Sequence, residues 1–232
     1  MRLILLLLTC LSSLLLQPVA AAGKDARSIL PSFDCAKATE EDEMAICSSR
    51  KLASLDVIIA DGYAQLQHRL GNGKAKRIGA PLLTRRRACR AEMDCIYRRQ
   101  LEIAKTLQTH GATIALPEWA AAGARSSGDK LPTAVGQCSQ TTIDDIGSRL
   151  EGDPDFSSGT SVSFSNGGYQ VTYDTEPAII SSRLGDPVTI CLASLPENCP
   201  PGDERGKTYK TTNARTGQSW TLSDAEHMCG GA

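Results

Sequence analysis

Eight cysteines constrain this chain more than any other feature of its sequence. They form two groups of four, one in each half of the chain, and a ninth cysteine lies apart near the start. The first group is Cys35, Cys47, Cys89 and Cys95, and the second is Cys138, Cys191, Cys199 and Cys229. An even number of cysteines in an exported chain predicts a disulfide framework. We therefore expect two cross-linked modules in an oxidising compartment.

Residues 1–22 have the features of a signal peptide. An apolar run spans Leu3 to Leu16, and Ala20 and Ala22 have the small-x-small spacing of a cleavage site. We expect cleavage near Ala22 and a periplasmic or secreted protein with no membrane span. One alternative is an uncleaved membrane anchor, but the apolar run is short for a membrane span. Another is a lipid attached to Cys10, but the apolar run continues beyond that residue.

Charge divides the chain into two unlike parts. Residues 30–115 contain 14 Lys and Arg against 10 Asp and Glu, whereas residues 116–232 contain 8 against 15. Opposite signs favour a charged partner or contact between the modules, although ordinary solubility also accounts for them. Aromatic residues are only 4% of the chain, so the small cores depend on cross-links for stability.

The first module, residues 30–115, has the pattern of two or three antiparallel helices. Thr39 followed by three acids is typical of a helix start. Apolar residues at steps of three and four from Leu52 to Leu70 predict an amphipathic helix. Pro81 is typical of the first turn of a second helix, which continues to about Gly111.

Helix geometry limits how the first four cysteines pair. In one unbroken helix, Cys89 and Cys95 would be about 9 Å apart along the axis, which exceeds the roughly 7 Å that a disulfide allows. A bond between them therefore requires a helix break, whereas bonds between helices do not. We favour the pairs Cys35–Cys95 and Cys47–Cys89.

A linker at residues 116–132, rich in Ala, Gly and Ser, leads to the second module, residues 133–232. Thr142 with Asp145 predicts a cap for a short helix through Leu150. Alternating residues on both sides of the turn at 166–168 predict a β-hairpin. Further strands are expected at residues 179–180, 188–192, 209–212 and 220–222. The predicted fold class is thus a helical disulfide-bonded bundle followed by a small strand-rich α+β domain with one short helix.

The second set of cysteines allows three pairings. Cys138 and Cys229 stand near the two ends of the module and could join them. Cys191 and Cys199 flank a short segment with a proline and could close a tight loop. We favour this arrangement among the three.

The first module resembles the LprI-type lysozyme inhibitor family over residues 31–107. The resemblance is carried by Pro31–Ala38, Ala45–Cys47, Leu52–Asp56 and Tyr63, then by Arg86, Cys89, Cys95 and Ile96. The sequence departs from the family pattern at Leu82, Arg87 and Gln100. The resemblance implies a small helical domain of the bacterial envelope that has no active site. The second module resembles uncharacterised extensions of exported bacterial proteins, which implies no chemistry.

Two binding functions follow as hypotheses. In the first, the chain binds and blocks a lysozyme, and the acidic second module meets the basic enzyme. Its speculative contacts are Ser157, Ser158, Asp203 and Glu204. In the second, a basic helix binds an anionic envelope polymer or serves as a scaffold. Its speculative contacts are Arg85, Arg86, Arg87 and Arg90, in a cluster that Arg98 and Arg99 extend. Nucleic acid is not expected, because no aromatic residues are interleaved with these arginines.

Catalytic, metal and cofactor chemistry is not expected. The cysteines form no Cys-x-x-Cys pair, which argues against zinc. Asp153, Asp155 and Ser157 have the alternate spacing of a calcium loop, but the closing glutamate is missing. His227 is the weak candidate for a hydrolase, and no nucleophile motif accompanies it.

Overall fold

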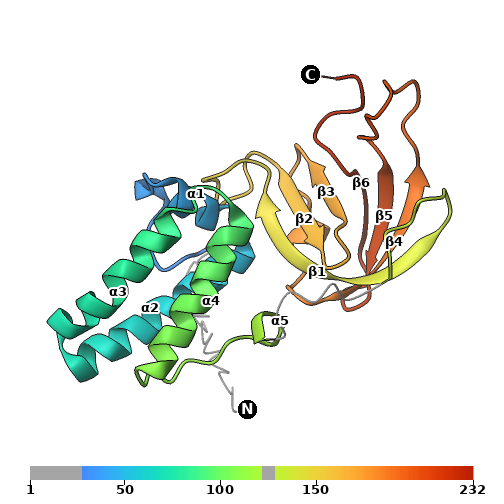
Figure 1. The fold of residues 1–232 in the computed structure, drawn as a ribbon. Helices are drawn as coiled ribbons and strands as arrows, with labels where there is room; N and C mark the ends of the chain where they lie inside the picture. Colours follow the sequence, from blue (N-terminus) through green and yellow to red (C-terminus); the bar gives the residue numbers. More distant parts are fainter. Residues whose placement is uncertain (1–27, 122–128, 232) are drawn as a thin grey trace, which may run out of the picture.

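The structure, a computed structural model, describes residues 28–121 and 129–231. Helices make up the first half and strands the second half, and the two halves lie side by side (Figure 1). The expected signal peptide and its cleavage site at Ala22 lie outside the described residues. Within the described ranges, no helix combines the length and apolarity that crossing a membrane requires.

The first half begins with a short 3-10 helix and continues with four α-helices. These elements are η1 (Cys35–Lys37), α1 (Glu41–Cys47), α2 (Arg50–Leu70), α3 (Asn72–Arg87) and α4 (Met93–Thr109). The predicted amphipathic helix is α2, and it packs against both α3 and α4. Gly71, at φ 79°, makes the whole turn between α2 and α3. We expected Pro81 in the first turn of a helix, but it lies inside α3.

All eight cysteines of the two groups form disulfides, as predicted. The predicted pairing in the first half is wrong, because Cys35 bonds Cys47 and Cys89 bonds Cys95. The required helix break is present: α3 ends at Arg87, α4 begins at Met93, and Arg90 between them has a φ of 53°. The break brings the Cα atoms of Cys89 and Cys95 to 5.6 Å.

The strands close into a barrel, which corrects the predicted α+β domain. The strands are β1 (Cys138–Ser148), β2 (Thr160–Phe164), β3 (Tyr169–Thr172), β4 (Pro187–Ser194), β5 (Thr208–Asn213) and β6 (Ser219–Ser223). They are all antiparallel and follow the order β1-β2-β3-β6-β5-β4 around the barrel. Closure pairs every strand with two neighbours, although β3 and β6 meet only at Val171 and Ser223.

Two short elements have the opposite type to the prediction. The expected helix from Thr142 to Leu150 is strand β1, whose bulge between Ile143 and Asp145 turns the Asp145 side chain out of the barrel wall toward α2. The expected strand at 179–180 is helix α6 (Pro177–Ile180). Its first turn contains a proline, and the Glu176 carboxylate accepts a hydrogen bond from the Ala178 amide.

The predicted cysteine pairing in the second half is also wrong. Cys138 bonds Cys191, because β1 and β4 are neighbours and these two residues are directly opposite. Cys199 bonds Cys229 and ties the loop after β4 to the segment after β6. The linker contains the short helix α5 (Glu118–Ala121).

The helices and the barrel share a hydrophobic core. One cluster of buried side chains includes Ile46 and Leu55 from the helices and Ile146, Phe156 and Ile179 from the barrel half. Backbone hydrogen bonds cross the same seam, from the Ser148 amide to the Ser48 carbonyl and from the Gly152 amide to the Met44 carbonyl. The helices and the barrel are thus packed as one body.

Candidate functional site

The basic helix end predicted as a polymer contact is largely neutralised within the molecule. Arg85 pairs with Glu102 at 2.7 Å, and Arg87 pairs with Glu43 at 3.6 Å. Arg90 remains exposed. This segment is therefore less cationic than its sequence suggests.

Arg86 has a structural role inside the helical half. Its Nε donates to the Asp42 carboxylate at 2.7 Å, and its Nη1 lies 3.4 Å from the Asp56 carboxylate. Asp56 also accepts hydrogen bonds from the amide and the hydroxyl of Ser32. All three charged side chains are buried, so Arg86 is not available to a partner.

The predicted contacts Ser157 and Ser158 belong to a turn between β1 and β2. The Asp153 carboxylate accepts hydrogen bonds from the Ser157 hydroxyl at 3.0 Å and from the amide and hydroxyl of Ser158 at 2.7 and 2.6 Å. The alternate spacing that resembles a calcium loop thus supports a polar turn. Of these two serines, Ser157 is exposed and Ser158 is half-buried.

The predicted contacts Asp203 and Glu204 are both paired within their own loop. Asp203 accepts two hydrogen bonds from the Arg205 guanidinium, at 2.9 and 2.8 Å, and one from the Gly230 amide. The Arg205 side chain, with smaller help from Gly230, holds the pKa of Asp203 well below its usual range. Glu204 pairs with Lys207 at 2.6 Å.

A more exposed feature lies on the outer face of β3 and at the residue that follows it, where Tyr169, Val171 and Tyr173 alternate. Tyr169 is 38% exposed and Tyr173 is 52% exposed, whereas Val171 between them is buried. Residues two apart on a strand share a face, so the two rings flank the same valine. The barrel therefore presents two large aromatic side chains to solvent.

Arg149, just after β1, holds this surface in place. Its guanidinium carbon lies 4.2 Å from the centre of the Tyr173 ring. Its Nε donates to the Ser158 carbonyl at 2.7 Å, and its Nη1 donates to Glu226 at 3.2 Å. The ring of His227 lies 6.4 Å from the Tyr173 ring. We call Arg149, Tyr169, Tyr173, Glu226 and His227 the tyrosine face.

The half of the chain that carries the tyrosine face is acidic as a whole. Residues 129–231 contain 14 Asp and Glu against 7 Lys and Arg. Within the tyrosine face itself, Arg149 and Glu226 neutralise each other. Asp174, directly after Tyr173, is exposed. The predicted contact Ser158 adjoins this surface through its carbonyl.

Sequence alternation alone does not identify the tyrosine face. Such a pattern usually places valine and tyrosine inside a sheet and glutamine outside. Here Gln170 is fully buried inside the barrel and the tyrosines point outward. The alternation in the short strand β3 therefore indicates the wrong inward face, and the pairing of β3 with its neighbours decides which side chains turn inward.

His227 and the acids near it do not form a metal site. Over residues 28–121 and 129–231, no group of three or more His, Cys, Asp or Glu side chains could hold a metal ion. No family model, no curated protein and no solved structure matches the chain.

Proposed function

We propose that this chain is an exported, non-catalytic binding protein that inhibits a lysozyme through the tyrosine face. The observation that carries the proposal is the pair of exposed tyrosines held beside Arg149 on an acidic barrel. The four disulfides fit an extracellular or periplasmic location.

The composition of the tyrosine face suits protein recognition. Tyrosine and arginine are enriched among the residues that contribute most to protein–protein binding. Arg149 is fixed by a carbonyl and a carboxylate, and the Tyr173 ring lies against it. Side chains that are already ordered lose less conformational entropy on binding, so more of their contact energy contributes to affinity.

The charge of the barrel half favours a cationic partner. An excess of seven acidic residues over residues 129–231 attracts a basic protein and raises its association rate. Because the first module resembles lysozyme inhibitors, we propose a basic lysozyme as the partner. The basic helix end is a weaker contact surface, because Arg85, Arg86 and Arg87 are paired with acids.

Titration of lysozyme activity with the oxidised mature protein tests the proposal. We expect Tyr173→Ser to weaken inhibition about 30-fold, which corresponds to a loss of about 2 kcal/mol at a central contact. Added salt should weaken inhibition by screening the acidic barrel. Circular dichroism would verify that the variant is folded.

Arg90→Ser is the matched control, because Arg90 is exposed and belongs to the competing surface. It should inhibit as well as the unmodified protein. Loss of inhibition in Arg90→Ser, with inhibition intact in Tyr173→Ser, would contradict the proposal and favour the envelope-polymer hypothesis. If the unmodified protein at large excess does not inhibit, that class of lysozyme is not its partner.

A further inference from the structure

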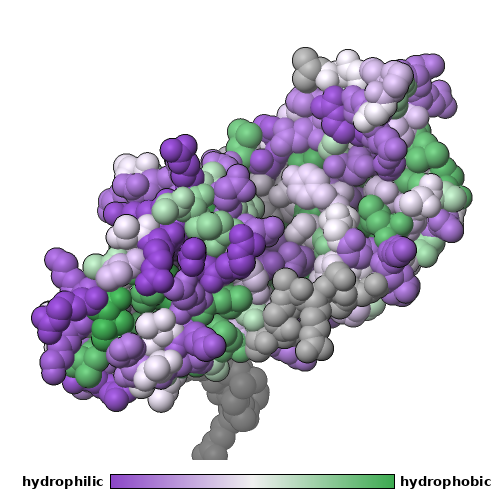
Figure 2. Space-filling view, viewed as in Figure 1, coloured by the Kyte–Doolittle hydropathy of each residue, from purple (hydrophilic) through white to green (hydrophobic). Residues whose placement is uncertain are grey.

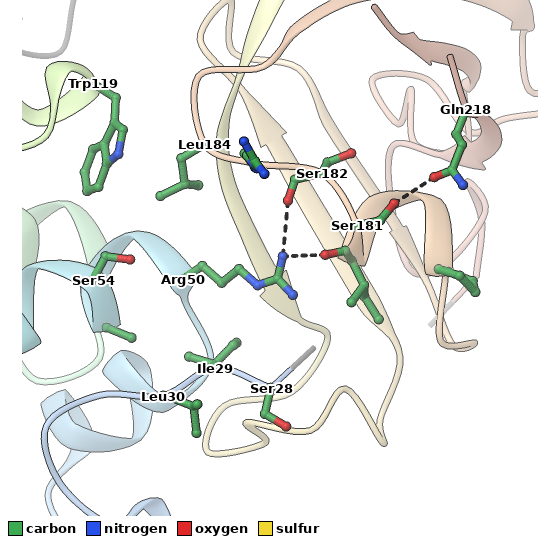
Figure 3. Close-up of a pocket in the computed structure, with 14 residues that line it drawn as sticks. Ser28, Ile29, Leu30, Arg50, Ser54, Trp119, Ser181, Ser182, Leu184 and Gln218 are labelled. Atoms are coloured by element: carbon green, nitrogen blue, oxygen red, sulfur yellow. Dashed lines mark hydrogen bonds between the residues drawn. The ribbon is translucent and has the colours of Figure 1, made fainter. Parts of the chain in front are cut away.

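A pocket of about 820 Å³ lies at the seam between the helices and the barrel. Helices α2, α5 and α6 and the loop after α6 form its walls (Figure 3). We call it the seam pocket. The lining residues that matter most are Arg50, Ser54, Trp119, Ser181, Arg183 and Gln218. Its size is within the range of sites for small organic ligands.

The charge of the seam pocket has one sign. Two arginines line it, and none of its lining side chains is acidic, although the barrel half that forms one side of it is rich in acids. Arg50 lies in the middle of the view in Figure 3, where its Nη1 donates to the Ile180 carbonyl at 2.7 Å. Its guanidinium also lies 5.2 Å from the centre of the Phe156 ring. Arg50 thus provides a positive charge at a fixed position, and the nearby buried Asp145 carboxylate offsets part of it.

Arg183 provides the second positive charge and is exposed. Its backbone amide is bound to Asp186 at 2.9 Å, which fixes the loop. Its guanidinium makes no hydrogen bond or ion pair with any residue in the described part of the chain. A cation placed this way can pair with the anionic group of a ligand at little cost to the folded protein.

The remaining walls are suited to a hydroxylated ring. The half-buried Trp119 stands at one side of the pocket, and Ser181 and Gln218 stand at the other (Figure 3). An indole ring offers a flat apolar surface, and the hydroxyls and the amide can exchange hydrogen bonds with sugar hydroxyls. The Ser181 hydroxyl already donates to Gln218 at 2.7 Å, which orders both groups.

We propose that the seam pocket binds an acidic sugar, with the carboxylate near Arg183 and Arg50 and an apolar face of the ring against Trp119. This function is separate from the tyrosine face, because the two sites share no residue. Since the ligand would contact both α2 and the loop after α6, it would also stabilise the packing of the two halves.

Isothermal titration calorimetry on the oxidised mature protein tests this proposal with three probes. N-acetylmuramic acid carries both the ring and a carboxylate, N-acetylglucosamine lacks the lactyl carboxylate, and lactate lacks the ring. We expect N-acetylmuramic acid to bind at least about tenfold more tightly than either of the other probes. Arg183→Gln should weaken its binding about tenfold, which corresponds to about 1.4 kcal/mol.

Lys210→Gln is the matched control, because Lys210 is an exposed cation of the same half that does not line the pocket. It should bind the acidic sugar normally. Equal affinity for both sugars would overturn the role of the carboxylate, and equal affinity for lactate would leave a simple anion site. Absence of binding, or normal binding by Arg183→Gln, would overturn the proposal as a whole.

Discussion

At the scale of single residues, Gln170 does most to specify the interior of the barrel. Its Nε2 donates to the carbonyls of Tyr209 and Leu222 at 2.6 and 3.1 Å. Its Oε1 accepts from the Thr211 hydroxyl at 2.6 Å and from the Trp220 indole at 2.9 Å. These four bonds use the full hydrogen-bonding capacity of the amide. One side chain therefore joins β3 to β5 and β6.

Replacing Gln170 should lower the free energy of unfolding. Gln170→Leu leaves two carbonyls, a hydroxyl and an indole N–H without their buried partner, so we expect a loss of about 2–4 kcal/mol in the free energy of unfolding. Urea denaturation monitored by circular dichroism measures the loss. Gln140→Leu is the control, since Gln140 is exposed on β1, and its effect should stay within about 0.5 kcal/mol. Equal effects of the two variants would contradict this role.

At the scale of secondary structure, elements with strong local patterns are predictable from the sequence. The three-to-four spacing from Leu52 to Leu70 identifies α2, and the turn at Asn166–Gly168 identifies the β2–β3 hairpin. The error at β1 has a physical reason. Thr142 and Asp145 have the spacing of a local helix cap, but Asp145 instead caps α2, a helix more than 90 residues away along the chain. Local rules cannot detect such a distant cap.

The barrel and the tyrosine face depend on pairings between distant strands, which the sequence does not reveal. Closure requires β3 to pair with β6, where Val171 lies opposite Ser223. Only this closure decides that Gln170 turns inward and that the tyrosines turn outward. The seam pocket cannot be predicted from the sequence for the same reason, because Trp119 and Arg183 line one cavity only after the two halves pack together. The hydrophilic face in Figure 2 carries only small hydrophobic patches, so surface composition gives little guidance either.

The loop between β1 and β2 offers a test at this scale. Gly159 has a φ of 119°, and a Cβ atom there would overlap the Thr172 carbonyl of β3. We expect Gly159→Ala to lower the free energy of unfolding by more than about 3 kcal/mol. Gly167→Ala is the matched control, because Gly167 has a φ of 85° and an added Cβ atom would meet open space. It should cost about 1 kcal/mol. Thermal denaturation distinguishes the two, and equal midpoints would contradict the steric argument.

At the scale of the whole molecule, Asp145 connects the barrel to the helices. Its carboxylate accepts hydrogen bonds from the Ser49 hydroxyl at 2.5 Å and from the Lys51 amide at 2.9 Å, in the first turn of α2. Burial raises the pKa of Asp145 to about 6, and the hydrogen bonds and the charge of Lys51 act more weakly in the opposite direction. The folded protein therefore binds this proton more tightly than the unfolded chain does.

This linkage gives stability a definite dependence on pH. The stabilising contribution of Asp145 is complete below about pH 4, where the carboxyl is protonated in both states. It is lost as the pH rises to about 6, because the unfolded chain releases its proton first. Two pKa units correspond to at most about 3 kcal/mol. The packing of the two halves should therefore weaken between about pH 4 and pH 6.

Asp145→Asn removes this titration and keeps an oxygen that can accept from the Lys51 amide. The free energy of unfolding of the native protein minus that of the variant should fall between about pH 4 and pH 6, then stay level. Urea denaturation measured by circular dichroism for the helices and by tryptophan fluorescence, which reports Trp220 in the barrel and Trp119 in α5, gives this difference. The two signals should change together because the halves share a core. Asp144→Asn is the control: it removes the 2.8 Å ion pair with Lys51 but should retain the fall that Asp145 causes. A difference that does not change with pH would show that Asp145 does not link proton binding to the packing of the two halves.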